Sequence, residues 1–362
     1  MLSIKNKPLV GLFLLIFGFS MMGCGAQNPG TPSGQDKSAK VNLTGAGSSF
    51  VYPLLNQQIE EYRKMNSNIT INYQSTGSGA GIKQVSEQTL DFGATDGPMT
   101  EDQMKAAKGG KLLHIPLTLG AVAVTYNVPN APKNLKIAPA DLADIFLGKI
   151  TNWNDQRIAT NNPGVTLPDT KITVAHRSDG SGTTYIFSDY LSSVSSEWSS
   201  KVGKGTSLNW PAGIGGKGNA GVAGAIQQTP GSIGYLELAY AVQNNLPYAT
   251  MQNKEGKWIT PSLQSTSAAA AATTIPEDMR VSIVNASGAD VYPIAGFTWV
   301  LIYQDQKDKT KGTALVNFVN WAIHEGQNLS EGLQYAKLPA SLVGREEAML
   351  RTITFEGQPI LK

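Results

Sequence analysis

Three glycine-rich loops carry side chains that could bind a ligand: residues 44–50 (TGAGSSF), 77–81 (GSGAG) and 177–183 (RSDGSGT). The third loop follows a β-branched run, 171–175, and precedes a helix-like run, 184–191. The first N–H groups of a helix lack intrahelical partners and lie at the positive end of the helix dipole. Glycine lets the backbone approach a ligand closely. The arrangement predicts a binding site for an oxyanion.

The loops offer the donors that would replace the water shell of an oxyanion. Backbone N–H groups, hydroxyls and one arginine can do this without many positive side chains. Glycine-rich turns after strands are common, so the loop with the arginine is the most specific of the three. The candidate donors are the hydroxyls, backbone N–H groups and guanidinium of Ser48, Ser49, Phe50, Ser78, Arg177, Ser181, Gly182 and Thr183.

Asp96 is the acidic candidate at the end of a short apolar run, 90–95. A carboxylate only accepts hydrogen bonds, so it repels an anion unless that anion carries a proton to donate. Hydrogen phosphate carries such a proton and sulfate does not. Asp96 could therefore select a protonated anion, because a buried acceptor left unpaired is costly. The alternative is that Asp96, which precedes Gly97 and Pro98, only forms a turn.

Asp179 lies two residues from Arg177 and could hold the guanidinium fork in place. The alternative for this pair is a structural role, in which it caps the loop. Constellations for catalysis are poor, since the three histidines, His114, His176 and His324, are isolated. We expect a protein that is not an enzyme and uses no metal or cofactor. A phosphomonoester hydrolase with Ser181 as the nucleophile stays open, although DGSGT lacks the G-x-S-x-G pattern.

The composition is that of a soluble globular protein, and 362 residues suggest about two domains. Two of the 29 Lys and Arg residues lie within residues 1–23, which contain no acid. The remaining chain therefore has 27 basic and 27 acidic residues. Without a basic field, we expect no nucleic-acid partner, and local donors must hold any anion.

Residues 1–23 have basic residues followed by an apolar run, as in a secretory signal peptide. The sequence MMGC, ending at Cys24, resembles a bacterial lipobox, in which the cysteine is lipidated. Residues 24–40 are rich in Gly, Pro and Ser and predict a flexible tether. We expect anchoring through Cys24 in the periplasm or on the outer face of the cell membrane. A retained transmembrane anchor and a free thiol are the alternatives.

Strand-like, loop and helix-like segments alternate along the chain, which predicts an α/β fold with mainly parallel sheets flanked by helices. Ligands bind such sheets at the carboxyl ends of the strands, where the three loops lie. The alanine run at 267–272 predicts a helix segment on the solvent side.

Six motifs together resemble the phosphate-binding proteins of bacterial ABC-type phosphate importers, from about Leu43 to near the C-terminus: TGAGSSF (44–50), DFGATD (91–96), IFLGKI (145–150) with Trp153, RSDGSGT (177–183), GGKGN (215–219) and GSIGY (231–235). The resemblance implies a two-lobed periplasmic binding protein fold of type II with phosphate in the cleft. Lobe 1 would comprise 41–126 and 293–362, and lobe 2 would comprise 127–292.

Carried over to this chain, the phosphate contacts fall on the candidate donors above and Asp96, with Asp179 orienting Arg177. Ser49 stands where the family commonly has Thr, and His176 where a second Arg often precedes the ligand arginine. The implied partners are phosphate, two permease subunits and a cytoplasmic ATPase, and we expect a monomer. A binding protein for another tetrahedral oxyanion, or an adhesin or sensor that retains the fold, stays open.

Overall fold

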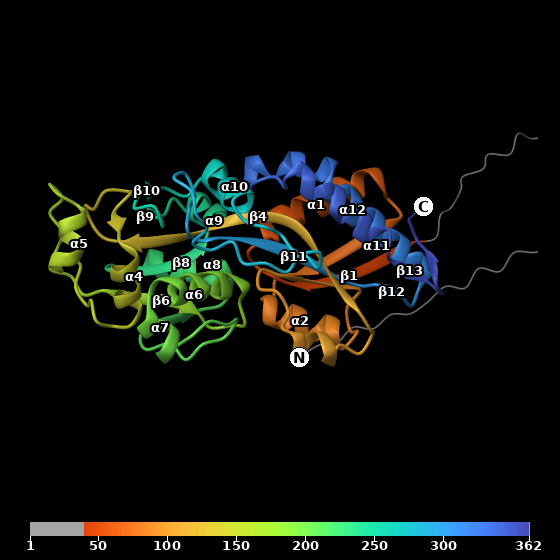
Figure 1. Cartoon of the computed structure of the whole chain (residues 1–362), viewed down its shortest axis with the longest axis horizontal. Helices are drawn as coiled ribbons and strands as arrows, with labels where there is room; N and C mark the ends of the chain where they lie inside the picture. The colour runs from red at the N-terminus through yellow and green to blue at the C-terminus, as the bar shows by residue number, and fades with distance from the viewer. Residues whose placement is uncertain (1–39, 362) are drawn as a thin grey trace, which may run out of the picture. The chain divides into compact units, whose positions relative to one another are not determined.

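The computed structural model describes residues 40–361. The expected signal peptide, the lipidated Cys24 and all but the last residue of the tether lie outside the described residues. An eight-stranded sheet runs through the described part in the order β2-β1-β3-β11-β4-β8-β6-β7 (Figure 1). Among residues 40–361, no helix combines the length and apolar character that crossing a membrane requires.

The first half of the sheet is built from three short parallel strands. β1 (Val41–Gly47) pairs with β2 (Ile69–Gln74) and β3 (Phe92–Thr95) on its two sides. Helix α1 (Tyr52–Met65) connects β1 to β2, and α2 (Ser78–Ser86) connects β2 to β3. The first helix begins just after the first glycine-rich loop, as the alternation of segments predicts, whereas α2 begins within the second one, at Ser78.

Two long strands lie in the middle of the sheet and run antiparallel to each other. β4 (Leu112–Asn127) pairs along its first part with β11 (Ala295–Tyr303) and along its last six residues with β8 (Ser232–Glu237). β4 is buried along almost its whole length, which explains its largely apolar sequence, interrupted by the buried residues His114, Thr118 and Thr125. A single strand thus links the two halves of the sheet.

The second half ends in parallel strands again. β6 (Thr173–Arg177) lies between β8 and β7 (Ile214–Gly216). Four of the seven pairings in the large sheet are parallel. The predicted α/β class with a mainly parallel sheet is therefore confirmed, and the antiparallel pairings are confined to the strands where the chain crosses between the halves.

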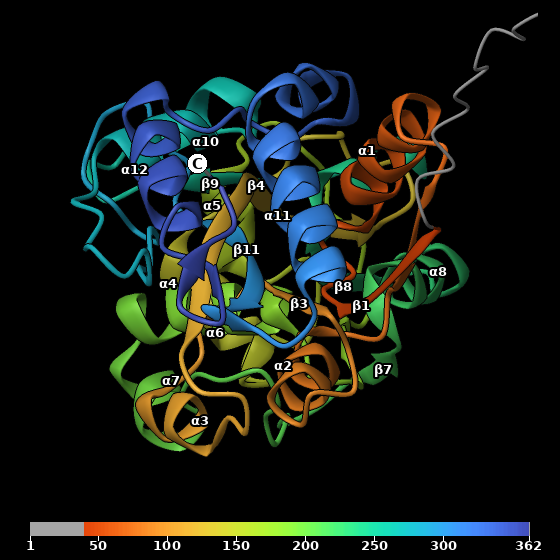
Figure 2. The same cartoon turned by 90° about the vertical axis from the view of Figure 1, so that its right-hand side faces the viewer.

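Helices cover both faces of the first half of the sheet. α11 (Lys309–Ile323) and α12 (Ala340–Leu350) lie side by side and contact β4, whereas α2 covers the opposite face (Figure 2). The remaining elements are α3 (Glu101–Ala106), β5 (Lys136–Ile137), α4 (Pro139–Phe146), α5 (Gln156–Asn161), α6 (Gly182–Val194), α7 (Ser196–Lys201), α8 (Gly218–Gln228), α9 (Leu238–Gln243), β9 (Thr250–Gln252), β10 (Trp258–Ile259), α10 (Leu263–Ala271), β12 (Asp305–Gln306), η1 (Glu325–Leu329), η2 (Glu331–Leu333), β13 (Thr354–Phe355) and β14 (Gln358–Pro359).

Two large hydrophobic cores meet along β4. Its residues up to Leu119 pack with β1, β11 and α11, and its residues from Ala121 pack with α4, α6 and α8. Ala269, within the range predicted for lobe 2, packs in the core of the first half. The lobe boundaries near 126 and 293 stay a prediction.

The alanine run does form the end of a helix, α10, but its predicted position on the solvent side holds only for Ala271 and Ala272, which are exposed. Ala269 and Ala270 are 0% and 3% exposed. Helix propensity says nothing about which face a helix buries, and small side chains let α10 approach β4 closely.

Glycine at position 81 is required for the contact between α2 and the sheet. A Cβ atom there would lie 2.6 Å from the Gly47 Cα and 2.7 Å from the Ala46 carbonyl oxygen. Backbone atoms cannot yield to such a contact as a flexible side chain could. We therefore expect Gly81→Ala to lower the free energy of unfolding by about 1–3 kcal/mol, as overpacking does.

The matched control is Gly224→Ala in α8, where an added Cβ would meet nothing within 4 Å. Alanine restricts the unfolded chain and favours the helix, so this variant should gain about 0.5–1 kcal/mol. Urea unfolding of both variants checks the pair of predictions. Equal stability of the two variants would show that α2 can move away from β1 without cost.

Candidate functional site

The first loop leaves β1 at Gly47, whose φ of +139° suits glycine. Its next three carbonyl groups each accept a hydrogen bond from a tyrosine that is distant in sequence. Ser48 O accepts from Tyr73 at 2.8 Å, Ser49 O from Tyr240 at 2.7 Å, and Phe50 O from Tyr335 at 2.6 Å. Because the tyrosines donate to these three carbonyl groups, the hydroxyl groups of Ser48 and Ser49 are left for other hydrogen bonds.

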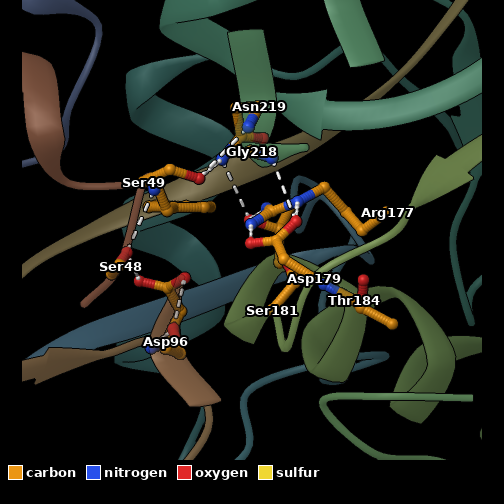
Figure 3. Close-up of polar contacts among 12 residues, drawn as sticks. Ser48, Ser49, Asp96, Arg177, Asp179, Ser181, Thr184, Gly218 and Asn219 are labelled. Carbon is orange, nitrogen blue, oxygen red and sulfur yellow. Dashed lines mark hydrogen bonds and ion pairs between the residues drawn. The ribbon is translucent and has the colours of Figure 1, made fainter. Parts of the chain in front are cut away.

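Ser48 and Asp96 form the acidic side of the site. Asp96 follows β3, is 2% exposed and accepts from the Ser48 hydroxyl at 2.5 Å (Figure 3). Its Oδ1 also accepts from Thr298 at 2.7 Å, and Ser78 lies 3.4 Å from Oδ2. The N–H of Phe50 donates to Ser48 Oγ at 3.0 Å rather than pointing away from the loop.

Burial is the dominant influence on the Asp96 carboxyl. It raises the pKa of Asp96 to about 6, against the opposing effects of the hydrogen bonds from Ser48 and Thr298 and of the charge on Arg177. The carboxyl is therefore ionised at neutral pH and close to the point where it would take up a proton.

Arg177 and Asp179 form a bidentate pair at the end of β6. The guanidinium donates from Nε to Oδ1 at 2.8 Å and from Nη2 to Oδ2 at 2.5 Å (Figure 3). Asp179 Oδ1 also accepts from the N–H of Gly218 at 3.0 Å. Burial raises the pKa of Asp179, but the hydrogen bonds and charge of Arg177 outweigh it, so the pKa lies below its usual value. The carboxylate thus fixes the plane of a guanidinium that is 3% exposed.

The third loop ends at the first turn of α6. Ser181 is the N-cap, and its hydroxyl accepts from the N–H of Thr184 at 3.0 Å. A Cβ on Gly182 would lie 2.5 Å from the Asp96 backbone nitrogen, so only glycine fits there. The start of α6 therefore lies against the acidic side of the site, and the helix dipole points its positive end there.

The second loop meets the third one through backbone atoms. The N–H of Gly79 donates to the Gly180 carbonyl at 2.9 Å, and a Cβ on Gly77 would lie 2.3 Å from Asp179 Oδ2. The three loops that the sequence singles out are therefore neighbours. Together with the end of β3, which carries Asp96, they bring together Ser48, Ser49, Ser78, Asp96, Arg177, Ser181, Gly182 and Thr183.

Sequence reasoning missed several residues that organise the site. Asn219 bonds to Ser49 and Thr183, Thr298 bonds to Asp96, and the three loop tyrosines come from distant segments. Asn219 ends the motif GGKGN, which supports the resemblance but by itself indicates no role for the asparagine. Tyrosines and threonines are ordinary core residues, so nothing in the sequence marks Thr298 or the three tyrosines as part of a site.

The histidines lie outside this arrangement. His114 accepts from the N–H of Met99, and burial lowers its pKa to about 3. His176 stacks on Trp210 with 4.8 Å between ring centroids, and His324 pairs with a glutamate on α12. No histidine in residues 40–361 is bonded to Ser181, and no cluster of three His, Cys, Asp or Glu residues there could hold a metal ion.

Comparison with known proteins gives a consistent result. A family model described as a PBP superfamily domain matches residues 29–325. The chain is 45% identical over 324 residues to phosphate-binding protein PstS of Xylella fastidiosa (strain 9a5c), which covers 89% of this chain and 88% of that protein. It is 41% identical over 313 residues to phosphate-binding protein PstS of Pasteurella multocida (strain Pm70), which covers 86% and 90% of the two chains.

A solved structure with a similar fold is the high-affinity periplasmic phosphate-binding protein PfluDING, determined with bound phosphate. The TM-score is 0.69 at 18% identity, and the match covers 85% of this chain and 93% of that one. The predicted resemblance and the two-lobed fold that it implied are both confirmed. The chain therefore belongs to the PBP superfamily and, within it, to the family of phosphate-binding proteins named PstS.

Proposed function

We propose that this chain is the substrate-binding protein of an ABC-type phosphate importer and captures inorganic phosphate where the three loops meet. The observation that carries the proposal is a buried carboxylate, Asp96, that no arginine pairs with, beside hydroxyls, a helix N-terminus and the guanidinium of Arg177, whose own carboxylate partner is Asp179. Donors alone would suit any oxyanion. A carboxylate among them suits an anion that carries a proton. Relatives with 41–45% identity that are named phosphate-binding proteins support the same ligand.

The proposal extends to how the protein works. The two lobes, 41–126 with 293–362 and 127–292, close on phosphate between them, and the candidate donors with Asp96 contact it while Asp179 orients Arg177. Ser48 and Phe50 would contact it only by exchanging the hydrogen bonds that they donate to Asp96 and to Ser48 Oγ. The permease subunits and the ATPase belong to other chains, and this chain acts as a monomeric receptor rather than an enzyme. The Ser181 hydroxyl accepts a hydrogen bond from the backbone N–H of Thr184 and caps α6. This structural role favours a receptor over a hydrolase that uses Ser181 as its nucleophile.

Selectivity against sulfate should depend on Asp96. Sulfate has no proton for the carboxylate, whereas the amide of Asp96→Asn can donate to it. We expect the wild-type protein to bind phosphate and give no heat with sulfate, and Asp96→Asn to bind sulfate at least about tenfold more tightly than the wild type does. Calorimetric titration of protein freed of co-purified ligand measures both.

Asp102→Asn is the matched control, because it removes the same charge from an exposed position on α3. It should leave both titrations unchanged. Equal binding of sulfate and phosphate by the wild type would point to another oxyanion. The hydrolase would be favoured if the wild type bound neither anion but hydrolysed a chromogenic phosphate ester, and if Ser181→Ala abolished that hydrolysis.

The pKa of Asp96 predicts that the selectivity changes with pH. Protonation turns the carboxyl from an acceptor into a donor, and it occurs as the pH falls through about 6. Sulfate affinity of the wild type should therefore rise between about pH 8 and about pH 5, while that of Asp96→Asn stays flat. Sulfate serves as the probe because, unlike phosphate, it does not titrate in this range. A flat wild-type profile would contradict the assigned role of Asp96.

The same pKa makes a prediction for the ligand-free protein. Because the folded pKa lies above the usual 3.8, the native state binds this proton more tightly than the unfolded state does. Asp96 should thus make the free energy of unfolding fall as the pH rises from about 4 to about 6. Asp96→Asn should lack this contribution. Urea unfolding of both proteins at several pH values would show it as a fall, with rising pH, in the free energy of unfolding of the wild type relative to that of Asp96→Asn.

We further propose that residues 1–23 direct export and that Cys24 carries a lipid anchor, with residues 24–40 as the tether. Export is supported by the similarity to PfluDING, which is a periplasmic protein. Wild-type protein expressed in bacteria should incorporate labelled palmitate and remain with the membrane fraction. Cys24→Ser should lose both properties and appear in the soluble fraction. Membrane retention of Cys24→Ser without label would indicate an uncleaved anchor instead.

A further inference from the structure

We propose that Asn219 is a positioning residue that compels the hydroxyls of Ser49 and Thr183 to act as donors toward the bound anion. The inference rests on the proposed function and adds a residue that acts through other groups rather than by touching the ligand. Asn219 lies in the first turn of α8 and is 0% exposed. Its side chain lies between the first loop and the start of α6 (Figure 3).

The orientation of the Asn219 amide is fixed by a backbone group. Asn219 Oδ1 accepts from the N–H of Glu237 at 2.9 Å. A backbone N–H can only donate, so the oxygen must face Glu237 and the NH₂ group must face the other way. The two hydrogens of Nδ2 then point toward Ser49 Oγ at 3.0 Å and Thr183 Oγ1 at 3.1 Å.

The Ser49 hydroxyl is saturated as an acceptor. It accepts from Nδ2 of Asn219 and from the backbone N–H of the same residue at 3.1 Å. A hydroxyl has two acceptor lone pairs and one proton. Both lone pairs of Ser49 are occupied, so the hydroxyl can take part in a further hydrogen bond only by donating.

The Thr183 hydroxyl is saturated in the same way by two different residues. It accepts from Asn219 Nδ2 and from Arg177 Nη1, the latter at 3.3 Å. Neither donor can exchange roles, because an amide NH₂ and a guanidinium have no acceptor on nitrogen. The proton of Thr183 is therefore also left for an acceptor outside this network.

The hydroxyl of Ser48 differs from those of Ser49 and Thr183. It accepts from the N–H groups of Phe50 and Val51 and donates its proton to Asp96. Ser48 therefore donates to a protein carboxylate, whereas Ser49 and Thr183 keep their protons for a ligand. A ligand proton finds no acceptor at Ser49 or Thr183, whereas the carboxylate of Asp96 can accept it. Fixing the hydroxyl protons before the ligand arrives also lowers the cost of ordering them on binding.

The test is a double-mutant cycle measured by calorimetric titration with inorganic phosphate. Asn219→Ala removes the donor. Asn219→Asp keeps an oxygen for the N–H of Glu237 but replaces the NH₂ by an acceptor, which draws both hydroxyl protons away from the ligand. Each substitution is made in the wild type and in the Ser49→Ala/Thr183→Val background, which lacks the two hydroxyls.

In the wild type we expect Asn219→Ala to weaken phosphate binding by about tenfold and Asn219→Asp by about 100-fold or more, since hydrogen bonds to charged groups are the strong ones. In the background without hydroxyls, Asn219→Ala should change the Kd by no more than about twofold. Asn219→Asp should retain there only the part of its effect that comes from its charge. Should Asn219→Ala not fold, the Asn219→Asp cycle alone decides.

A purely structural role would give the same loss of affinity in both backgrounds, and that result would overturn the inference. Asn253→Ala is the control for a buried asparagine whose amide bonds to loop backbone instead, at Gly288 and Ala289. It should lower the thermal stability but leave the phosphate Kd unchanged. Failure of the proposed function is separable, because it appears as absence of phosphate binding by the wild type itself.

Discussion

The structure depends on keeping a carboxylate buried at Asp96, in the proposed site for an anion. Burial alone would drive Asp96 to its neutral form, and the hydroxyls of Ser48 and Thr298 oppose this. The start of α6 adds the positive end of a helix dipole, and it can approach only because residue 182 is glycine. This contact depends on the sheet topology. β3 leads to Asp96 and β6 leads to α6, and these two strands are far apart in the sheet order.

The proposed site offers an anion no surplus of positive charge. Asp179 neutralises Arg177 through two hydrogen bonds, and the chain beyond residue 23 has equal numbers of basic and acidic residues. Attraction must therefore come from oriented dipoles at close range, which discriminate by geometry and by proton position. A strong positive field would instead favour any anion of sufficient charge.

Much of this arrangement could be predicted from the sequence, because loops between strands and helices carry local signals. The glycines, the hydroxyls, the arginine and its aspartate could all be identified, as could the α/β class. Contacts over long sequence separations could not. The tyrosines that bond to the first loop are Tyr73, Tyr240 and Tyr335, and in the sequence none of them can be told from an ordinary core residue. The double pairing of β4 also depends on tertiary context, because an apolar run does not reveal its partners.

Asn219 shows why a motif alone does not define a role. Its amide acts on two hydroxyls only because the N–H of Glu237 holds its oxygen, and Glu237 in turn caps α9 by accepting from Ala239. Burial, with a smaller effect of the Asp96 charge, keeps the pKa of Glu237 well above its usual range, which favours the neutral form. Asp179 is ionised but paired with Arg177, so a further ionised carboxylate at Glu237 would repel the anion. The network therefore supports the proposal that its hydroxyls donate and that the Asp96 carboxylate accepts the proton of the ligand.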